Sequence, residues 1–246
     1  WFNACIDAHK KLGIEPRGAK VVAFDPADIG GDAKGYIERQ GIVFTCLDEI
    51  MGENGNVAMD EACKRAIMFG ADSFGYDADG LGATLRDNVS KCFNGKATHI
   101  FAYKGSGAIH SPDARFKSDN SNVTIKGDVL NKDVLYNRKA QNIISFAERV
   151  YRTYEAVEKG IYHDPETLVS FCSESIKPNM MQKFKAEACK IPLKPGDTIR
   201  FYTKDELKKG VLLSDGSRIK IPSPNIFDAA KLSFDKDSII TKVKEI

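Results

Sequence analysis

Near its N-terminus the chain reads Lys20-Val-Val-Ala-Phe-Asp-Pro-Ala-Asp-Ile-Gly-Gly-Asp32, an apolar run followed by an aspartate and a glycine-rich turn. The run up to Phe24 predicts a buried strand, and Asp25 ends it because the proline and paired glycines that follow favour a turn. A second stretch, Ser73-Phe-Gly-Tyr-Asp77 followed by Ala-Asp-Gly-Leu-Gly82, has the same arrangement. Two strands that each end in an aspartate predict an α/β sheet with a ligand site at the strand ends, where glycines leave open space beside the carboxylates.

The rest of the chain alternates between predicted strands and helices. The most regular helix is predicted over residues 138–159, where apolar side chains recur at helical spacing. Residues 36–39 and 42–47 are expected to pair as an antiparallel hairpin, and the polar stretch 105–135 is interpreted as a long surface loop. This order indicates a single α/β domain over residues 1–246. We also expect helices at 59–69, 84–93 and 180–190, strands at 99–103 and 198–202, and a hairpin turn at Ser214-Asp-Gly-Ser217.

The composition is that of an ordinary soluble globular protein. The chain has 246 residues, of which 42% are hydrophobic and 28% charged, and its formal net charge is +2, so the total charge demands no nucleic-acid partner. The six cysteines form no Cys-x-x-Cys pair, and no signal peptide or membrane-spanning apolar run is evident, so we expect reduced thiols in a cytosolic protein. Because the sequence begins at Trp1 rather than at a methionine, we interpret it as a fragment of a longer protein.

A third aspartate lies in the segment Ser223-Pro-Asn-Ile-Phe-Asp-Ala-Ala-Lys-Leu-Ser-Phe234. Ser223 as a capping residue and Pro224 at the first helical position predict that a helix begins here. Apolar residues cover too much of this helix for it to lie on the surface, so Asp228 is expected to be buried. A buried carboxylate must be paired, hydrogen-bonded or metal-bound, because an isolated buried charge is very costly.

Asp25, Asp77 and Asp228 together predict a divalent metal site. Three carboxylates that crowd together without bases repel one another, and bound divalent cations relieve the repulsion. Carboxylate and water ligands favour Mg²⁺ or Mn²⁺, and the sequence has no His/Cys constellation of the kind that binds zinc. Two such ions about 3.5–4 Å apart would clamp the attacking and leaving oxygens of a phosphodiester. Asp32 and Asp79 are positioned to help, either as additional ligands or by holding the ligands in place.

Simpler roles stay open for the same aspartates. Asp25 and Asp77 could be turn formers or helix caps at the strand ends. Asp228 could form an ion pair with Lys231, three residues further along the same helix. An Asp228 side chain far from the other two, or turned toward a lysine or arginine instead of toward them, would contradict the metal site.

Four segments taken together resemble the motifs of one protein family. They are Val22-Ala-Phe-Asp-Pro-Ala-Asp-Ile-Gly-Gly-Asp32, Tyr76-Asp-Ala-Asp-Gly-Leu-Gly82, Asn137-Arg-Lys-Ala-Gln141 and Ile221-Pro-Ser-Pro-Asn-Ile-Phe-Asp-Ala229. In this order they are similar to the first and second acidic motifs, the Asn-x-Lys-Ala-Gln segment and the third acidic motif of one kind of nuclease domain. That domain belongs to the large terminase subunit of tailed phages or prophages. The segments occur in the family's order and span nearly the whole chain.

The resemblance implies an RNase H-like fold, with a central mixed β-sheet flanked by helices. It also implies a two-metal endonuclease that cuts concatemeric phage DNA with little sequence specificity during genome packaging. The family's catalytic acids fall on Asp25, Asp77 and Asp228, and Asp32 matches an additional acid that some members carry near the metals. We expect Asp25 to bridge two Mg²⁺ or Mn²⁺ ions while Asp77 and Asp228 complete the separate shells. One ion would activate a water and the other would stabilise the leaving 3′ oxygen.

The resemblance further implies partners and a second domain. The family's partners are double-stranded DNA, the portal protein and the small terminase subunit, in the host cytoplasm. Its members carry a packaging ATPase N-terminal to the nuclease, and since no phosphate-binding loop occurs here we interpret the chain as the nuclease half alone. Basic side chains around the cleft are expected to hold the DNA backbone without reading its sequence, the candidates being Lys104, Arg115, Lys117, Lys183, Lys185, Lys208 and Lys209.

Two other functions stay open at this point. The first is another RNase H-like nuclease, such as a junction resolvase or an RNase H. The second is a non-catalytic DNA-binding or assembly module in which the acids are structural and bind no metal.

Overall fold

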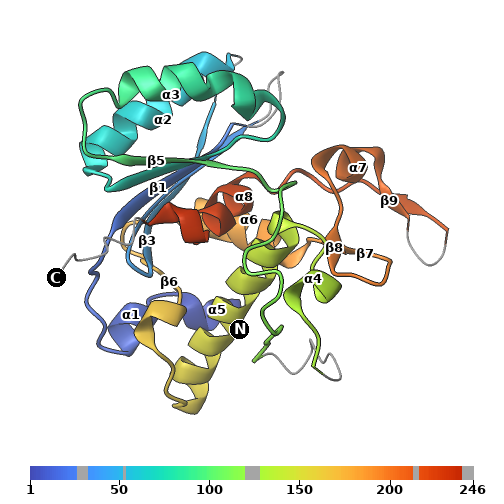
Figure 1. Ribbon diagram of the computed structural model, residues 1–246. Coiled ribbons are helices and arrows are strands. Elements are labelled where there is room, and N and C mark those ends of the chain that lie inside the picture. Colours follow the sequence, from blue (N-terminus) through green and yellow to red (C-terminus); the bar gives the residue numbers. More distant parts are fainter. Residues whose placement is uncertain (27–32, 52–53, 120–127, 213–215, 240–246) are drawn as a thin grey trace.

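The centre of the structure is a six-stranded mixed β-sheet. The computed structural model describes residues 1–26, 33–51, 54–119, 128–212 and 216–239 (Figure 1). The strands of the sheet are β1 (Lys20–Asp25), β2 (Lys34–Gln40), β3 (Val43–Ile50), β4 (Ser73–Asp77), β5 (His99–Tyr103) and β6 (Ser170–Phe171). Their order is β5-β4-β1-β2-β3-β6, with β1, β4 and β5 parallel and β2 antiparallel to both β1 and β3.

Side chains of β1 alternate between two hydrophobic cores, one on each face of the sheet. Val22 and Phe24 belong to one core, whereas Ala23 belongs to the other. Asp25 follows the same alternation and therefore lies on the face of Ala23. An apolar strand thus ends in a carboxylate on one defined face of the sheet.

The register between parallel strands extends this position into a row. Phe24 of β1 lies beside Tyr76 of β4, and Asp77 of β4 lies beside Tyr103 of β5. Asp25, Asp77 and Tyr103 consequently occupy neighbouring positions across β1, β4 and β5. The ends of three adjacent strands present two carboxylates and one phenol to the same helical layer.

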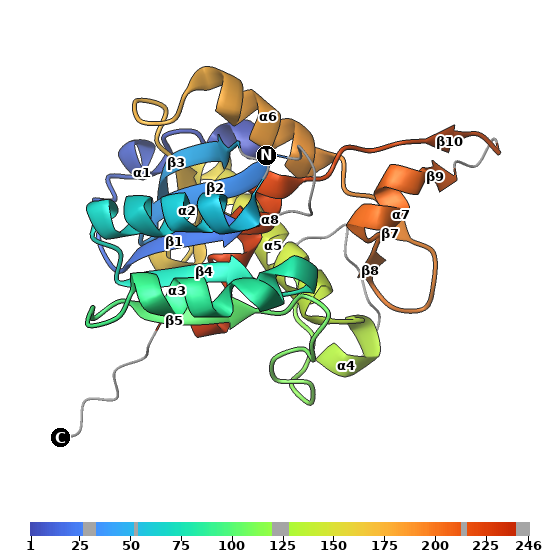
Figure 2. The ribbon, with the colours of Figure 1, turned by 90° about the horizontal axis from the view of Figure 1, so that it is seen from above.

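Helices cover both faces of the sheet (Figures 1 and 2). One face carries α2 (Gly55–Phe69) and α3 (Arg86–Cys92), and the other carries α5 (Arg138–Lys159), α6 (Pro178–Cys189) and α8 (Asn225–Leu232). Every residue of α8 is buried, since this helix lies between the sheet and the other two helices. The arrangement confirms the mixed sheet flanked by helices that the resemblance predicts.

The first turn of α8 lies unusually close to β2. A Cβ atom added to Gly35 would be 1.9 Å from the carbonyl oxygen of Asn225, so no larger residue fits without a shift of the backbone. The Asn225 side chain donates a hydrogen bond of 2.6 Å to the carbonyl of Ala33, next to the same strand. These contacts set the depth of α8, and with it the position of Asp228.

The start of α8 differs from the sequence prediction. The helix begins at Asn225, Pro224 precedes it, and the Ser223 hydroxyl does not cap it. Instead, the Glu187 carboxylate of α6 accepts a hydrogen bond of 3.0 Å from the backbone amide of Phe227. A neighbouring helix thus satisfies one of the open amides of the first turn, and no local sequence pattern reveals that.

Short elements project from one side of the molecule (Figures 1 and 2). The strands β7 (Leu193–Lys194) and β8 (Arg200–Phe201) form one small hairpin, and β9 (Val211–Leu212) and β10 (Arg218–Ile219) form another. Between them in the chain lies α7 (Lys204–Lys209), which begins with a capping box of Thr203 and Glu206. The predicted strand over 198–202 is therefore reduced to the two residues of β8.

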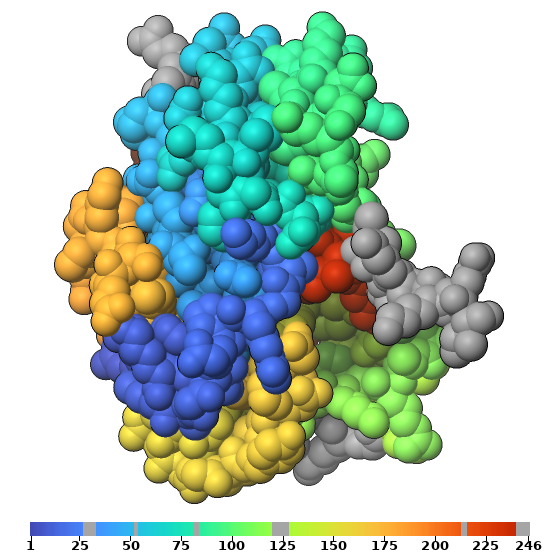
Figure 3. Space-filling model, turned by 90° about the vertical axis from the view of Figure 1, so that its left-hand side faces the viewer, coloured from blue at the N-terminus to red at the C-terminus, as the bar shows by residue number. Residues whose placement is uncertain are grey.

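The N-terminal segment packs against the opposite part of the molecule. It contains the 3₁₀-helix η1 (Phe2–Cys5) and the short helix α1 (Ala8–Lys11), and the backbone amide of Asp7 donates a hydrogen bond of 2.9 Å to Phe171 of β6. In the space-filling view the blue N-terminal segment lies against the yellow segment that contains the end of α5 (Figure 3). No other strand of the described sheet lies beyond β6, so this segment covers the sheet edge.

Two stretches depart from the predicted elements. The helix predicted over 84–93 is divided into the 3₁₀-helix η2 (Gly80–Leu85) and α3. Within 105–135, predicted as a loop, the structure has a short helix α4 (Asn131–Val134), at whose start the Asp133 carboxylate accepts a hydrogen bond from the backbone amide of Leu130. The helix predicted over 138–159 is confirmed as α5. The predicted turn at 29–32 and the first two residues of the turn predicted over 214–217 lie outside the described residues.

Replacing Gly35 tests the close packing of α8 on β2. Gly35→Ala is expected to lower the free energy of unfolding by about 1–3 kcal/mol, because the added methyl group forces helix and strand apart. Urea unfolding measures this loss. Gly55→Ala is the matched control, since nothing lies within 4 Å of a Cβ atom at this first residue of α2, and its stability should stay equal or rise slightly. Equal stability of Gly35→Ala and the wild type would contradict the packing.

Candidate metal centre

Asp25, Asp77 and Asp228 line a single cavity of about 310 Å³. Asp25 ends β1 and Asp77 ends β4, while α8 lays Asp228 over the same face of the sheet. Asp25 and Asp228 are each only 2% exposed. The structure therefore brings together the three acids that the sequence singles out, and their role as metal ligands stays a prediction.

A lysine side chain lies between two of these acids. Lys204, the first residue of α7, forms an ion pair with Asp25, and its ammonium nitrogen is 3.6 Å from Oδ2 of Asp228. Burial alone would lower the pKa of Lys204, but the charges of Asp25 and Asp228 outweigh it and raise the pKa above its usual value. The ammonium group thus supplies positive charge at the point where the two buried carboxylates would otherwise repel each other.

Asp228 has a second basic partner within its own helix. The ammonium nitrogen of Lys231 lies 2.8 Å from Oδ1 of Asp228, at ion-pair distance but without the angles of a hydrogen bond, and both side chains are almost fully buried. The ion pair that the sequence left open is therefore present. Asp228 nevertheless faces the cavity that Asp25 and Asp77 also line, and Lys204 links it to Asp25. The ion pairs with lysines therefore leave the three aspartates together in one cavity.

Asp77 differs from the other two acids because no lysine or arginine of the described residues lies within ion-pair distance of it. Burial and the nearby charge of Asp25 raise the pKa of Asp77 to about 7. Its Oδ1 accepts a hydrogen bond of 3.0 Å from the backbone amide of Asp79. Asp77 is thus the acid of the cavity that would gain most from an added cation.

The structure bears differently on the predictions made for Asp79 and Asp32. Both oxygens of Asp79 accept hydrogen bonds from Ser106, at 2.8 Å from its amide and 2.7 Å from its hydroxyl. These bonds fasten the segment after β5 to the segment after β4, which favours a role for Asp79 in holding the site rather than in binding metal. Asp32 lies outside the described residues, so its predicted role as an additional ligand stays a prediction.

Sequence reasoning missed two lysines of the cavity, Lys139 and Lys204. Among the basic residues predicted to surround the cleft, Lys208 lines this cavity, whereas Lys183 pairs with Glu49. Lys139 had one available signal, its place in the Asn137–Gln141 segment. Nothing in the local sequence distinguishes Lys204 from an ordinary lysine on a solvated helical turn.

Tyr103 and Lys139 complete one wall of the cavity. The Tyr103 hydroxyl is buried and has no hydrogen-bond partner among the described residues. Burial and the charges of Asp77, Asp235 and Asp228 raise its pKa far above the usual value, so the phenol stays protonated. Burial also lowers the pKa of Lys139.

Two other groups of side chains have the composition of metal ligands, with ligand atoms within 4.8 Å of one another. They are Asp7, His9 and Cys172, and His110, Asp235 and Asp237. Both groups already have partners of their own, because Ser173 donates to Asp7 and Arg138 pairs with both Asp235 and Asp237. A larger cavity of about 560 Å³ lies between α6 and the segment before α8, but it contains none of the three aspartates. The three candidate catalytic aspartates therefore all lie in the smaller cavity.

The chain is similar in sequence and structure to one family of known proteins. No protein-family model and no curated protein matches the sequence. Among solved structures, the nuclease domain of the large terminase subunit of bacterial virus Sf6 is 38% identical, with a TM-score of 0.81 and coverage of 94% of each chain. The chain belongs to the nuclease domains of phage large terminase subunits.

Two further structures of the Sf6 terminase subunit agree with this membership. A mutant with calcium is 36% identical, with a TM-score of 0.83, and the match covers 94% of this chain and 95% of that one. A mutant with manganese and beta-thujaplicinol is 37% identical, with a TM-score of 0.81 and coverage of 94% of each chain. Membership of the terminase nuclease family confirms the predicted RNase H-like fold. No helix of the described terminase nuclease domain has both the length and the hydrophobicity that a membrane span requires.

The raised pKa of Asp77 predicts a pH dependence of stability in the metal-free protein. An unfolded chain loses this proton near the ordinary value of 3.8, whereas the folded chain keeps it up to about pH 7. Folding therefore takes up a proton in this range, and the contribution of Asp77 to stability falls as the pH rises through it. Asp77→Asn removes this loss of stability at higher pH, because asparagine does not titrate.

Urea unfolding in EDTA at about pH 5 and about pH 8 measures the effect. The stability of Asp77→Asn relative to the wild type is expected to be higher at the upper pH than at the lower. Asp87→Asn, on the exposed surface of α3, is the matched control. The same response to pH in both variants would show that Asp77 does not hold its proton as described.

Proposed function

We propose that the chain is a metal-dependent DNA endonuclease that cuts concatemeric viral DNA during genome packaging, with little sequence specificity. The observation that supports this most directly is the shared cavity of Asp25, Asp77 and Asp228. Membership of the terminase nuclease family supports DNA as the substrate. The calcium and manganese in the Sf6 structures support a requirement for divalent cations.

The donor set suits Mg²⁺ or Mn²⁺. The three acids offer hard oxygen ligands, and no histidine or cysteine belongs to the described lining of the cavity. Lys204 already holds a positive charge between Asp25 and Asp228, which indicates that this space accommodates a cation. We infer that Asp25, Asp77 and Asp228 hold two ions, with Asp32 as a further candidate ligand. When bound, these ions would activate a water and stabilise the leaving oxygen of the phosphodiester.

The protein's own residues prepare the cavity for this role. Lys231 lies on Oδ1 of Asp228, which orients Oδ2 toward Lys204 and the cavity. Lys204 must leave Asp25 before a cation can take its place, and its side chain is 27% exposed, so it has a path to solvent. Asp77 releases its proton to become a ligand. Cation binding at Asp77 is therefore favoured as the pH rises.

The proposed partners follow from the terminase family. They are double-stranded DNA as the substrate, and the portal protein and the small terminase subunit as protein partners. We further propose that residues 1–246 act as one nuclease domain in the host cytoplasm. Translocation of DNA would belong to the ATPase domain that the family carries N-terminal to the nuclease.

The nuclease role is tested by Mn²⁺-dependent nicking of supercoiled plasmid DNA. Asp25→Asn and Asp228→Asn are each expected to reduce nicking to the background rate, because each removes a charged ligand. Circular dichroism and thermal unfolding verify that the variants fold. Since Asp228→Asn leaves Lys231 buried without its partner, the double variant Asp228→Asn/Lys231→Met serves as its folding control. Nicking at the wild-type rate by either single variant would overturn the assignment.

A substrate comparison separates this proposal from its alternatives. Linear duplex DNA, a four-way junction and an RNA–DNA hybrid are offered to the wild-type protein in Mn²⁺. The terminase proposal expects cleavage of plain duplex, whereas a junction resolvase requires the junction and an RNase H requires the hybrid. A non-catalytic module would cut none of them, and calorimetry would detect no Mn²⁺ bound at the stoichiometry of the site.

Lys204 provides a separate test of the cation site. Lys204→Met is expected to bind Mn²⁺ more tightly, because the ammonium group no longer competes for Asp25 and Asp228. A charged hydrogen bond contributes about 1.5–3 kcal/mol, so calorimetry should find the dissociation constant lowered by about tenfold or more. Lys209→Met, on the same short helix but outside the cavity lining, should leave it unchanged. Weaker binding by Lys204→Met would place the cation elsewhere.

A further inference from the structure

We propose that Lys139 is a catalytic residue whose ammonium group contacts a non-bridging oxygen of the scissile phosphodiester. The proposal rests on the proposed nuclease function and adds one residue to its site. Lys139 lies in the first turn of α5 and lines the cavity that contains Asp25, Asp77 and Asp228. It is therefore a cation placed where the phosphate of a substrate must enter.

Lys139 differs from two other lysines that line this cavity, Lys204 and Lys231. Lys204 and Lys231 are both bound to aspartates of the cavity. No carboxylate of the described chain lies within ion-pair distance of Lys139. Among the described residues its ammonium group donates one hydrogen bond, a long contact of 3.4 Å to the carbonyl of Tyr202. A partly buried ammonium group with such a weak partner has donors left for an anion.

The charges of the cavity assign different tasks to Lys139, Lys204 and Lys231. Lys231 is buried against Asp228 within one helix, and Lys204 occupies the space between Asp25 and Asp228. Cations held by the aspartates would take the place of Lys204, whereas Lys139 could stay because it occupies no carboxylate oxygen. Lys139 then faces the phosphate from the α5 side of the cavity.

The backbone of α5 does not compete with Lys139 for the phosphate. The amides of Arg138 and Lys139 donate to the carbonyls of Gly107 and Gly105, at 3.0 and 2.8 Å. The amide of Ala140 donates to the side chain of Asn137, which caps the helix. The first three amides of the helix are therefore occupied, and an anion at this end has the Lys139 side chain as its donor.

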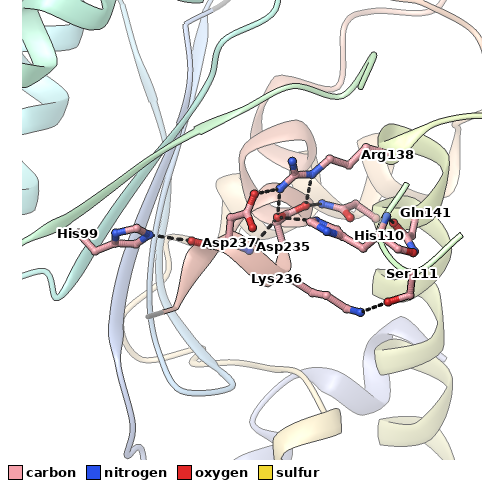
Figure 4. Close-up of polar contacts among 9 residues, drawn as sticks. His99, His110, Ser111, Arg138, Gln141, Asp235, Lys236 and Asp237 are labelled. Carbon is pink, nitrogen blue, oxygen red and sulfur yellow. Dashed lines mark hydrogen bonds and ion pairs between the residues drawn. The ribbon is translucent and has the colours of Figure 1, made fainter. Parts of the chain in front are cut away.

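A polar cluster holds the first turn of α5 in place (Figure 4). Arg138 binds Asp235 through two nitrogens, one of them at 2.8 Å, and also pairs with Asp237. Gln141 exchanges two hydrogen bonds with the backbone of His110, at 2.7 and 2.9 Å, and the His110 ring lies 3.2 Å from Asp235. Lys139 projects from a turn that is anchored on both sides of it, as positioning of a catalytic group requires.

Gly105 packs closely against both Lys139 and Tyr103. A Cβ atom at Gly105 would lie 3.3 Å from Cβ of Lys139 and 3.2 Å from the ring of Tyr103. Such contacts are tighter than normal packing, so a side chain here would require Tyr103 or Lys139 to shift by a few tenths of an ångström. The glycine therefore lets the segment after β5 approach both the phenol and the lysine closely.

The test compares the wild type with Lys139→Met, Lys139→Arg and the control Lys64→Met. Methionine keeps the apolar stem without the charge, arginine keeps the charge, and Lys64 is exposed on α2, on the other face of the sheet. Lys139→Met is expected to cut duplex DNA in Mn²⁺ about 10²–10³-fold more slowly in single turnover, as for the loss of one oxyanion donor. Lys139→Arg should retain part of the rate, and Lys64→Met all of it.

Two readouts besides cleavage distinguish a phosphate contact from a structural role. Calorimetry should show that Lys139→Met binds Mn²⁺ no more weakly than the wild type. Anisotropy of a labelled duplex in Ca²⁺, with the DNA verified intact, should show weaker binding and a salt slope smaller by about 0.9, the value of one lost phosphate contact.

Each outcome bears on one proposal. Wild-type cleavage by Lys139→Met, an unchanged salt slope, or a loss of Mn²⁺ affinity that parallels the loss of cleavage would overturn the role of Lys139. If Lys139→Met fails to fold, the result for Lys139→Arg decides. A folded Lys139→Arg protein that neither cuts nor binds DNA, although it keeps the charge, would also contradict the role of Lys139. A wild-type protein that cuts no DNA would instead overturn the nuclease function itself.

Discussion

Repulsion between buried carboxylates is the constraint on which the whole site depends. Asp25 and Asp228 are almost fully buried, and Asp77 lies next to Asp25 without a basic partner of its own among the described residues. Without metal, the ammonium groups of Lys204 and Lys231 compensate part of this charge. The proton that Asp77 keeps up to about pH 7 compensates another part. Each of these devices marks a position at which positive charge is favoured.

The two lysines compensate that charge in different ways. Lys231 is on the same helix as Asp228, three residues away, and has almost no exposed surface, so the pair moves as one unit. Lys204 comes from α7, in the projecting part of the chain, and about a quarter of its side chain is exposed. One lysine is therefore a fixed part of the core, and the other is a contact between the cavity and a peripheral helix. Cations that compete for the aspartates would compete with Lys204, the lysine of the peripheral helix.

The depth of α8 connects the fold to this electrostatic problem. Glycine at position 35 lets the helix approach β2 closely, and Glu187 and the Ala33 carbonyl fix its first turn. A helix lying further from the sheet would hold Asp228 away from the strand ends and expose it to water. The burial that makes the carboxylates costly and the geometry that brings them together therefore have the same origin.

The sequence by itself determined the strands that end in Asp25 and Asp77, the bounds of α5 and the buried setting of Asp228, because short-range patterns of apolar residues, turns and caps encode them. Its acidic motifs also indicated the family. Only the tertiary structure decided that Lys204 lies between Asp25 and Asp228, that Glu187 rather than Ser223 serves the start of α8, and that Lys139 enters the cavity without a carboxylate partner. These contacts join residues far apart in the chain, and the energies that select them come from burial and charge in the assembled fold. No local pattern contains that information.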